Sequence, residues 1–224
     1  MEIQEHSIFR ALSAERQDEL LRAARMLRFR KGDLIYPPGG DFGRVYLLGE
    51  GEAMIGTYSP SGTRRMVLMV VTAGDLFGDL SFAQGLAANE GDTFAESLTD
   101  TRAYCVSTPV FAQCVREEKE ALVTLLAYLT RRLYRSESKL SELAFCGVGE
   151  RLVRELVRWG KEVGQVSKGT LVIGKAVTHE QLAAMVGASR EAVTEALHDL
   201  AKKGLVTASR RGLVIAERLS ETLN

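Results

Sequence analysis

An uninterrupted leucine stripe between residues 117 and 145 is the feature that most restricts how this chain can fold. Neither glycine nor proline occurs in this stretch, and at 1.5 Å rise per residue a helix of this length extends about 43 Å. Its apolar positions alternate spacings of four and three residues, as in a coiled-coil seam. The stripe consists of Leu122, Leu126, Leu129, Leu133, Ser136, Leu140 and Leu143. This heptad spacing predicts pairing with a second copy in a parallel homodimer, while a single helix lying on the rest of the chain is the alternative.

The chain before this helix reads as short β-prone runs separated by glycines. An amphipathic helix is expected from Ala14 to Met26, and ten glycines from Gly32 to Gly78 are expected at the turns between strands. The β-prone runs occupy residues 44–48, 52–58, 64–71 and 102–106. Short strands with frequent glycine turns are typical of an antiparallel sandwich or jelly roll. Residues 1–110 are therefore predicted to form a β-roll domain.

The sequence Cys-Gly-Val-Gly at 146–149 is expected to end the long helix and act as a hinge, because glycine readily adopts the backbone conformations that terminate helices. This places a dimerisation helix and hinge at 111–147 and a second domain at 148–224. The second domain begins with an amphipathic helix that carries Leu152, Leu156 and Trp159 on one face, and a short strand pair follows near 169–174. The predicted fold class is α+β.

Two short helices joined by a tight turn are predicted within residues 177–203. Thr178 and Gln181 form a T-x-x-Q capping box that starts the first helix. Gly187 ends this helix, and Ser189 can cap the next one after a turn of only a few residues. Ala183 supplies the small residue needed where the helices cross. This spacing is the pattern of a helix-turn-helix motif.

The second of these helices has one apolar face and one polar face. The residues expected to point inward are Val193, Ala196, Leu197 and Leu200. Gly204 is expected to end the helix. The opposite face carries Arg190, Glu191, Thr194, Glu195 and His198. Two short strands follow, joined by a turn with Arg210 and Arg211, which is a wing suited to contact a phosphate backbone. Arginine can donate two hydrogen bonds to guanine, and glutamate can accept one from cytosine.

Composition and charge favour an intracellular globular protein. The formal net charge is zero, but residues 1–110 carry 11 − 15 = −4 and residues 148–224 carry 12 − 9 = +3, so the C-terminal end is the more probable site for a polyanion. The longest apolar run, 66–71, is too short to span a membrane, and we expect no secretory signal. We expect a cytoplasmic protein without a membrane association. The cysteines Cys105, Cys114 and Cys146 form no C-x-x-C pattern, and we expect them to be reduced core residues.

At this point the residues resemble a known family. The chain is similar over nearly its full length to the CRP/FNR family of bacterial transcription regulators, and the stretch Gly-Ala-Ser-Arg-Glu-Ala-Val at 187–193 resembles that family's G-x-S-R-E-x-V recognition motif. By this resemblance Arg190 and Glu191 read G·C pairs and Ser189 contacts phosphate. Glu195 departs from the pattern, because members close to the cyclic AMP receptor carry a second base-reading arginine there. The resemblance therefore implies a related but altered palindromic site.

The function predicted from these features is a homodimeric, sequence-specific DNA-binding transcription regulator rather than an enzyme. It reads double-stranded DNA through a recognition helix at 189–203 and is expected to contact RNA polymerase. The alternative is a ligand-binding regulatory subunit whose winged helix binds protein. The candidate DNA contacts are Thr178, His179, Ser189, Arg190, Glu191, Thr194, Glu195, His198, Lys202, Lys203, Arg210 and Arg211.

The resemblance also implies an effector site around residues 75–97. In nucleotide-binding members, a carboxylate after Phe-Gly contacts the ribose and a later arginine holds the cyclic phosphate. Here Asp79 provides the carboxylate, but Gly91 and Asp92 stand near the position of the arginine. The candidate effector residues are Gly78, Asp79, Leu80, Asp92, Thr93, Arg132, Ser136 and Glu137.

Three readings of this site remain open. A cyclic nucleotide such as cAMP binds with altered contacts, no effector binds because Arg132 pairs with Asp79, or another small ligand binds. An iron–sulfur cluster or haem is not expected, because no cysteine precedes Cys105 and the histidines are His6, His179 and His198. We predict no metal site.

Overall fold

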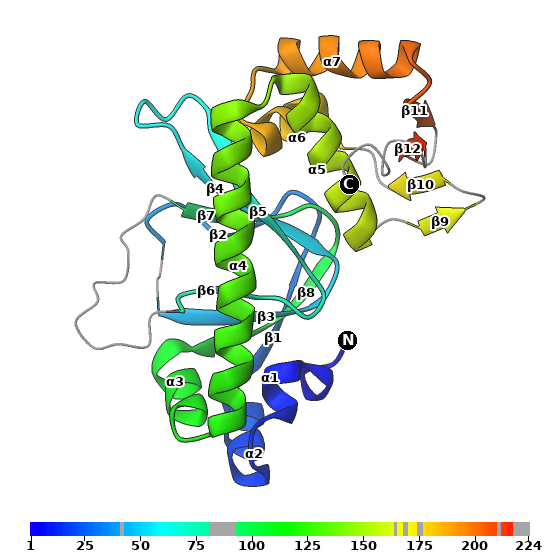
Figure 1. The fold of residues 1–224 in the computed structure, drawn as a ribbon. Coiled ribbons are helices and arrows are strands. Elements are labelled where there is room, and N and C mark those ends of the chain that lie inside the picture. The colour runs from blue at the N-terminus through cyan, green and yellow to red at the C-terminus, as the bar shows by residue number, and fades with distance from the viewer. Residues whose placement is uncertain are drawn as a thin grey trace. The chain divides into compact units, whose positions relative to one another are not determined.

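The computed structural model describes residues 1–40, 43–80, 93–163, 165–167, 170–173, 177–209 and 212–216. The chain divides into two compact units (Figure 1). The first unit comprises Met1–Pro60 and Leu68–Ser136, and the second comprises Ser61–Val67 and Glu137–Asn224. In the described ranges, every helix is too short or too polar to cross a membrane. The sequence-based boundaries at 110 and 147 stay a prediction.

The first unit is a β-roll of two antiparallel four-stranded sheets, with strand orders β1-β8-β3-β6 and β2-β7-β4-β5. Its strands are β1 (Arg25–Phe29), β2 (Leu34–Tyr36), β3 (Arg44–Glu50), β4 (Glu52–Tyr58), β5 (Arg65–Thr72), β6 (Leu76–Gly78), β7 (Thr93–Ser97) and β8 (Thr101–Ser107). A buried cluster that includes Leu48, Ile55, Phe77 and Ala95 joins residues from both sheets. The predicted β-roll is confirmed.

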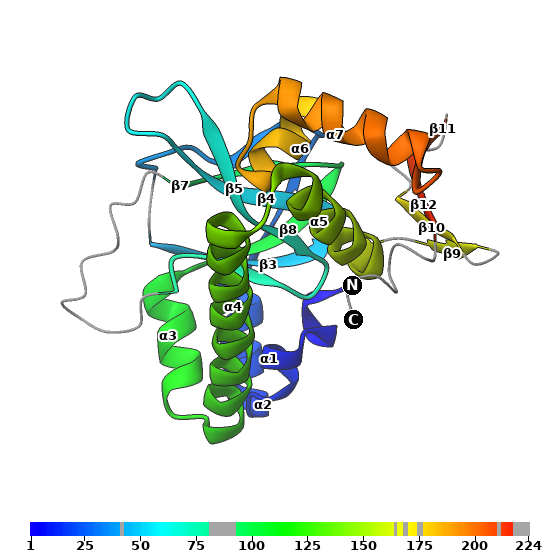
Figure 2. The same cartoon turned by 45° about the horizontal axis from the view of Figure 1, so that its top comes forward.

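Short helices surround the start of the long helix α4 (Lys119–Phe145) (Figure 2). They are η1 (Ile3–Glu5), α1 (Ser7–Arg10), α2 (Ala14–Ala23) and α3 (Thr108–Arg116). Ile8, Leu20, Phe111 and Ala121 belong to one buried cluster, and each comes from a different helix. This second core fixes the first part of α4 to the β-roll.

Two local predictions for the first unit were wrong. The helix predicted to reach Met26 ends at Ala23, because Arg25–Phe29 pairs with β8 as strand β1. Gly49 and Gly56 lie inside β3 and β4 rather than at turns. A side chain at Gly49 would place its Cβ 2.9 Å from the Met1 carbonyl oxygen, so a close backbone approach explains that glycine.

The predicted stripe on α4 is largely exposed in the single chain. Leu126, Leu133 and Leu140 are 65%, 58% and 66% exposed, whereas Ala121 and Leu125 on another face are buried. The helix therefore both lies on the β-roll core and leaves an unpartnered apolar stripe. Such a stripe favours the predicted pairing with a second copy.

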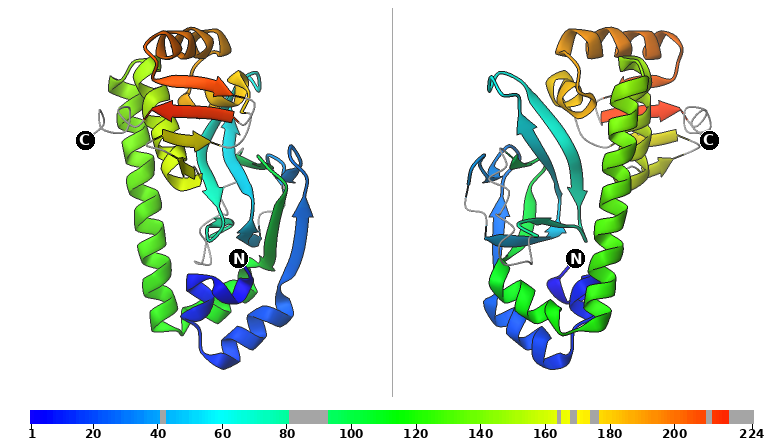
Figure 3. Two further views of the ribbon diagram at one scale, coloured as in Figure 1. Left: turned by 90° about the vertical axis from the view of Figure 1, so that its right-hand side faces the viewer. Right: turned by 60° about the vertical axis from the view of Figure 1, so that its left-hand side comes forward.

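The second unit holds helices α5 (Val148–Val163), α6 (His179–Val186) and α7 (Arg190–Lys202). Its sheet has the order β11-β12-β10-β9 and is visible in Figure 3. The strands are β9 (Gln165–Ser167), β10 (Thr170–Ile173), β11 (Val206–Ser209) and β12 (Gly212–Ala216). Leu152, Leu156 and Trp159 of α5 are buried as predicted. The break after α4 is shorter than predicted, because Val148 and Gly149 already belong to α5.

Candidate nucleic-acid interface and effector site

Local hydrogen bonds build the predicted helix-turn-helix. The Thr178 hydroxyl accepts a hydrogen bond from the Gln181 amide at 3.1 Å, and the Gln181 side chain accepts one from the Thr178 amide at 3.0 Å. Gly187 then ends α6 in the left-handed region, with φ of 62°. The Ser189 hydroxyl accepts from the Ala192 amide at 3.2 Å and caps α7. All three predicted signals therefore act at the positions where the sequence places them.

The apolar side of the motif packs as predicted. Ala183 is 5% exposed where the helices cross, and Val193 is completely buried. The chain leaves α7 through Gly204, whose φ is 64°, and the Leu205 amide donates to the Leu200 carbonyl at 2.9 Å. These contacts fix the orientation of α7 within the second unit, so its polar face is presented on a rigid element.

The structure places every described candidate on α7 at the surface. The exposed residues are Arg190, Glu191, Thr194, Glu195, His198 and Lys202, followed by Lys203 at the end of the helix. Ser189 and the first residues of α6, Thr178 and His179, are exposed as well. Arg210 and Arg211, the predicted tip of the wing, lie outside the described residues, between strands β11 and β12 that pair through Ser209 and Gly212.

His179 and Thr194 join the two helices on the exposed face. Their side chains, Nδ1 and Oγ1, are 2.8 Å apart. The Thr194 hydroxyl also donates to the Arg190 carbonyl oxygen at 2.8 Å. The start of α6 and the first turn of α7 therefore form one continuous surface.

Glu195 lies on a different part of α7 from Arg190. It lines a cavity of about 710 Å³ between α5 and α7. The other charged residues that line this cavity are Glu150 and Arg154 of α5, Asp199 of α7, and Lys203 at the C-cap of α7. Arg154 donates to Glu150 at 2.8 Å. Because five consecutive residues advance a helix by more than one turn, Glu195 is rotated about 140° from Arg190. The side chains of Glu195 and Arg190 therefore leave α7 in different directions.

An arginine that the sequence analysis missed connects α5 to the turn of the motif. The guanidinium of Arg151 donates to the carbonyls of Leu143, Cys146 and Gly187 at 3.5, 3.4 and 3.5 Å. It thereby links the end of α4, the break after it and the turn between α6 and α7. The position of Arg151 four residues after Gly147 gives no sequence signal for this role.

In the first unit, a tight turn positions the start of the effector segment. Gly78 has φ of 92°, and a Cβ there would lie 2.4 Å from the Arg44 carbonyl oxygen. The next amide, of Asp79, donates to that same carbonyl at 2.8 Å, and the Asp79 carbonyl accepts from the Thr108 hydroxyl at 3.1 Å. Leu80 packs against the helical core cluster. Only glycine fits this turn, as the resemblance implied.

Thr93, at the start of β7, contacts Tyr36 across the sheet. Burial raises the pKa of Tyr36, while Arg132 and a hydrogen bond with Thr93 act in the opposite direction. Arg132 of α4 and the first residue of β7 therefore share Tyr36 as a neighbour. Asp92, the residue before Thr93, lies outside the described residues.

One face of α4 carries an arginine cluster that sequence reasoning found only in part. Tyr128, Arg131, Arg132 and Arg135 line a cavity of about 40 Å³ together with Asp75 and Met69. Spacings of three and four residues place these four α4 side chains on one face. Arg132 was predicted, whereas Arg131 and Arg135 were missed, although Arg131 lies three residues after Tyr128 and Arg135 lies four residues after Arg131.

Tyr128 fixes this face of α4 to strand β6. Its hydroxyl donates to the Leu76 carbonyl at 2.5 Å and accepts from the Leu76 amide at 3.2 Å. Burial raises the pKa of Tyr128 to about 12, with Asp75 acting in the same direction. In one of the three readings Arg132 pairs with Asp79, whereas in the structure Arg132 lines the cavity with Asp75.

Ser136 and Glu137 lie outside this arginine cavity. Ser136 is exposed and donates to the Arg132 carbonyl at 3.1 Å, one turn earlier. Glu137 is also exposed. In the single chain they therefore do not line this cavity, and a contact with a ligand across a dimer stays a prediction.

Comparisons with known proteins fit this architecture. Residues 26–118 match the model of the cyclic nucleotide-binding domain, and residues 150–220 match that of the Crp-like helix-turn-helix domain. A CRP-like cAMP-activated global transcriptional regulator of Mycobacterium tuberculosis is 28% identical over 211 residues, which cover 94% of this chain and 92% of that protein. A global nitrogen regulator of Nostoc sp. is 25% identical over 189 residues, covering 84% and 83%.

Solved structures show the same fold. FixK2 from Bradyrhizobium japonicum matches with a TM-score of 0.74 at 19% identity, covering 90% of this chain and 97% of that one. The c-di-GMP responsive regulator CLP of Xanthomonas campestris matches with a TM-score of 0.73 at 24% identity, covering 91% and 99%. A β-roll, a long helix and a capped helix-turn-helix with an exposed polar face define a DNA-binding transcription regulator. The chain belongs to the CRP/FNR family of these regulators.

Proposed function

We propose that the protein acts as a homodimer that reads a palindromic DNA site through α7. The observation that carries this proposal is the exposed face of Arg190, Glu191 and Thr194 at the N-terminal end of a rigidly capped helix. The exposed stripe with Leu126 and Leu133 supports a two-fold dimer. Two recognition helices related in this way read half-sites about 34 Å apart.

We propose different roles for the candidate contacts. Arg190 and Glu191 reach base edges, while Ser189, Thr178 and Lys202 are suited to phosphate oxygens. Glu195 faces the cavity beside Glu150, which supports a site that differs from that of relatives with an arginine at this position. Contact with RNA polymerase and action in the cytoplasm, where a bacterial chromosome resides, belong to the same proposal.

Selection of binding sites from a random library tests this function. Wild-type protein should enrich a palindrome, and Arg190→Ala should weaken binding by ~1 to 3 kcal/mol and relax preference at one base pair. Lys161→Ala, an exposed change on α5, is the matched control and should leave both affinity and preference unchanged. Unaltered preference in Arg190→Ala would contradict the assignment.

Salt dependence separates DNA binding from the alternative in which the winged helix binds protein. Several phosphate contacts release counterions, so log affinity should fall linearly and steeply with log salt. Lys202→Ala should reduce this slope by about one unit without changing the selected sequence. A shallow slope with no enriched sequence would favour the protein-binding alternative.

We also infer that a phosphate-bearing effector binds at the arginine cluster of α4. Three guanidinium groups against the Asp75 carboxylate make this cavity electropositive, and residues 79–93 contain neither lysine nor arginine. Arginine is well suited to hold a phosphate through paired hydrogen bonds. The names of two relatives, one cAMP-activated and one c-di-GMP responsive, make cyclic nucleotides the first probes.

The effector proposal is tested by calorimetric titration with cAMP, cGMP and c-di-GMP. One of these nucleotides should release heat, and Arg132→Gln should weaken its binding at least about tenfold because a charge-assisted pair is lost. Arg22→Gln, an exposed change on α2, serves as the control. The Tyr128 bonds to Leu76 hold α4 to β6 without any ligand, so tight operator binding with no heat from any nucleotide would favour a regulator that needs no effector.

A further inference from the structure

The short segment Ser61–Val67 groups with the unit that carries the helix-turn-helix rather than with the strands that flank it in sequence. Its neighbours Pro60 and Leu68 both belong to the first unit. The chain therefore passes between units before Ser61, after Val67, and again after Ser136 within α4. The passage after Val67 and the passage after Ser136 both lie next to a residue of one hydrogen bond, which joins Val67 to Lys139.

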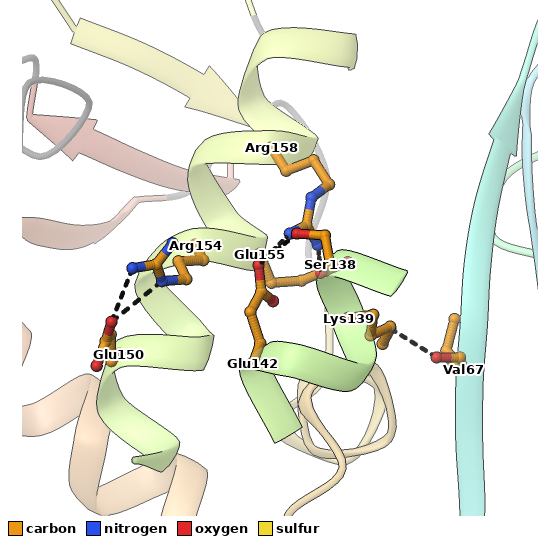
Figure 4. A network of polar contacts seen from close by, with 8 residues as sticks. All are labelled: Val67, Ser138, Lys139, Glu142, Glu150, Arg154, Glu155 and Arg158. Carbon is orange, nitrogen blue, oxygen red and sulfur yellow. Dashed lines mark hydrogen bonds and ion pairs between the residues drawn. The ribbon is translucent and has the colours of Figure 1, made fainter. Parts of the chain in front are cut away.

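That hydrogen bond joins Lys139 of α4 to Val67 of β5. The Lys139 ammonium donates to the Val67 carbonyl oxygen at 2.7 Å, and Figure 4 shows its side chain directed at the strand that carries Val67. The Val67 side chain is completely buried, and Lys139 itself is half-buried. Burial lowers the pKa of Lys139. A charged donor on a buried carbonyl is a strong contact, and its loss leaves that carbonyl without this donor.

The carboxylates near Lys139 do not need it as an ion-pair partner. Glu142 and Glu155 are each 8% exposed, and both accept from the guanidinium of Arg158 at 2.6 Å (Figure 4). Ser138 donates to Glu142 at 3.5 Å. A lysine placed only to neutralise these carboxylates would bond to one of them. Lys139 instead donates its hydrogen bond to the backbone of a segment that is 72 residues away in sequence.

The Glu142–Arg158–Glu155 network extends this contact to the DNA-binding helices. Glu142 lies on α4, one turn after Lys139, whereas Glu155 and Arg158 lie on α5. Helix α5 in turn packs against both α6 and α7. The 61–67 segment, the end of α4 and the base of the helix-turn-helix are thus connected through polar contacts of 2.6 and 2.7 Å.

We propose that Lys139 is a positioning residue that fastens the 61–67 segment to α4 and thereby preorganises the helix-turn-helix for DNA. This inference rests on the proposed function as a dimeric reader of a palindrome. When the 61–67 segment is held to α4, the second unit loses less conformational entropy on binding both half-sites than it would without this contact. The contact therefore raises the effective concentration of the second recognition helix at the second half-site, and it leaves the affinity for one isolated half-site unchanged.

The test compares Lys139→Met, Lys139→Arg and the exposed control Lys161→Met in the full-length protein. Operator affinity is measured on the palindrome selected by the wild type and on one isolated half-site, and hydrogen–deuterium exchange is followed in residues 61–67. Methionine keeps the apolar stem but removes the charge and the donor. Arginine retains both, so it is the conservative rescue.

We expect Lys139→Met to weaken palindrome binding about tenfold, with half-site binding unchanged, because only the bivalent step depends on preorganisation. Exchange in 61–67 should become at least about tenfold faster, since the closed state loses a charge-assisted hydrogen bond. Lys139→Arg should recover most of both effects, and Lys161→Met should behave as wild type.

Equal weakening of palindrome and half-site would indicate damage to the fold and would overturn the proposal. Unchanged palindrome affinity in Lys139→Met, or unchanged exchange in 61–67, would also overturn it. A wild-type protein that selects no DNA site refutes the proposed function instead. In that case accelerated exchange confined to 61–67 still supports the Lys139 tether, and unchanged exchange removes it.

Discussion

Acid should destabilise the first unit through His6. This side chain is 2% exposed, and its Nδ1 accepts a hydrogen bond from the Ile8 amide at 3.2 Å at the start of α1. Burial lowers the pKa of His6 from 6.5 to about 4, with a contact to the Gly74 backbone acting in the opposite direction. The folded state therefore binds the proton less readily than the unfolded state.

The sign and size follow from this difference in proton binding. Stability is fully retained above the unfolded pKa of about 6.5 and falls as the pH drops toward the folded pKa of about 4. A difference of about 2.5 units corresponds to ~3.4 kcal/mol when the loss is complete. At about pH 5 the same relation gives a loss of ~2 kcal/mol.

Urea unfolding at about pH 7.5 and pH 5 measures this loss. His6→Asn retains a side-chain acceptor for the Ile8 amide but does not titrate, so its stability should fall by ~2 kcal/mol less than that of the wild type over this interval. His198→Asn, an exposed change on α7, is the control and should track the wild type. Equal losses in wild type and His6→Asn would refute the reasoning.

Three further changes have defined outcomes. Gly187→Ala forces alanine into the left-handed region and brings its Cβ to 2.9 Å from Leu143, so thermal unfolding of the second unit should report a loss of at least ~1 to 2 kcal/mol; an unchanged transition would contradict the strained turn. Leu133→Glu places a charge in the exposed stripe, and sedimentation should shift from dimer to monomer, whereas a persisting dimer would exclude this stripe as its interface. Tyr128→Phe removes both bonds to Leu76 and should lower stability by ~1 to 3 kcal/mol in urea unfolding; no change would show that these bonds do not hold α4.

The helix-turn-helix could be predicted in detail because its signals are local. Thr178 and Ser189 cap helices through hydrogen bonds to amides three residues away. Gly187 ends α6 in the left-handed backbone conformation, which glycine adopts without strain. Such contacts depend on adjacent residues and not on the rest of the fold. Sequence pattern was therefore sufficient to place every turn of this motif.

The errors in the first unit have the opposite cause. Residues 25–29 have the amphipathic character of a continuing helix, but pairing with β8 about 76 residues later makes them a strand. Gly49 likewise resembles a turn residue until the approach of Met1 is known. Because neither contact involves sequence neighbours, periodicity and turn propensity contain no information about it.

The candidate effector site stays a prediction, and the sequence identified the residues that surround it only in part. The Phe-Gly-Asp sequence located Gly78, and its backbone conformation and close approach to Arg44 can be adopted only by glycine. One of the three readings paired Arg132 with Asp79, whereas the register of α4 against β6 brings Arg132 beside Asp75. That register is set by the contact of Tyr128 with Leu76, which joins residues 52 positions apart and has no local signature.

Helix α4 carries both the exposed leucine stripe with Leu126 and Leu133 and the arginine cluster, so one helix bears the proposed dimer contact and the proposed effector site. Leu133 directly follows Arg132 in sequence, and their side chains occupy different faces, one exposed and one lining the cavity. A ligand that neutralises the arginines changes the packing of the stripe only if it binds one position of α4 more tightly than another, and if the two positions differ in how the stripe packs. Linkage then requires the effect to be mutual. A nucleotide that tightens the dimer must bind the dimer more tightly than the Leu133→Glu monomer, by the same factor.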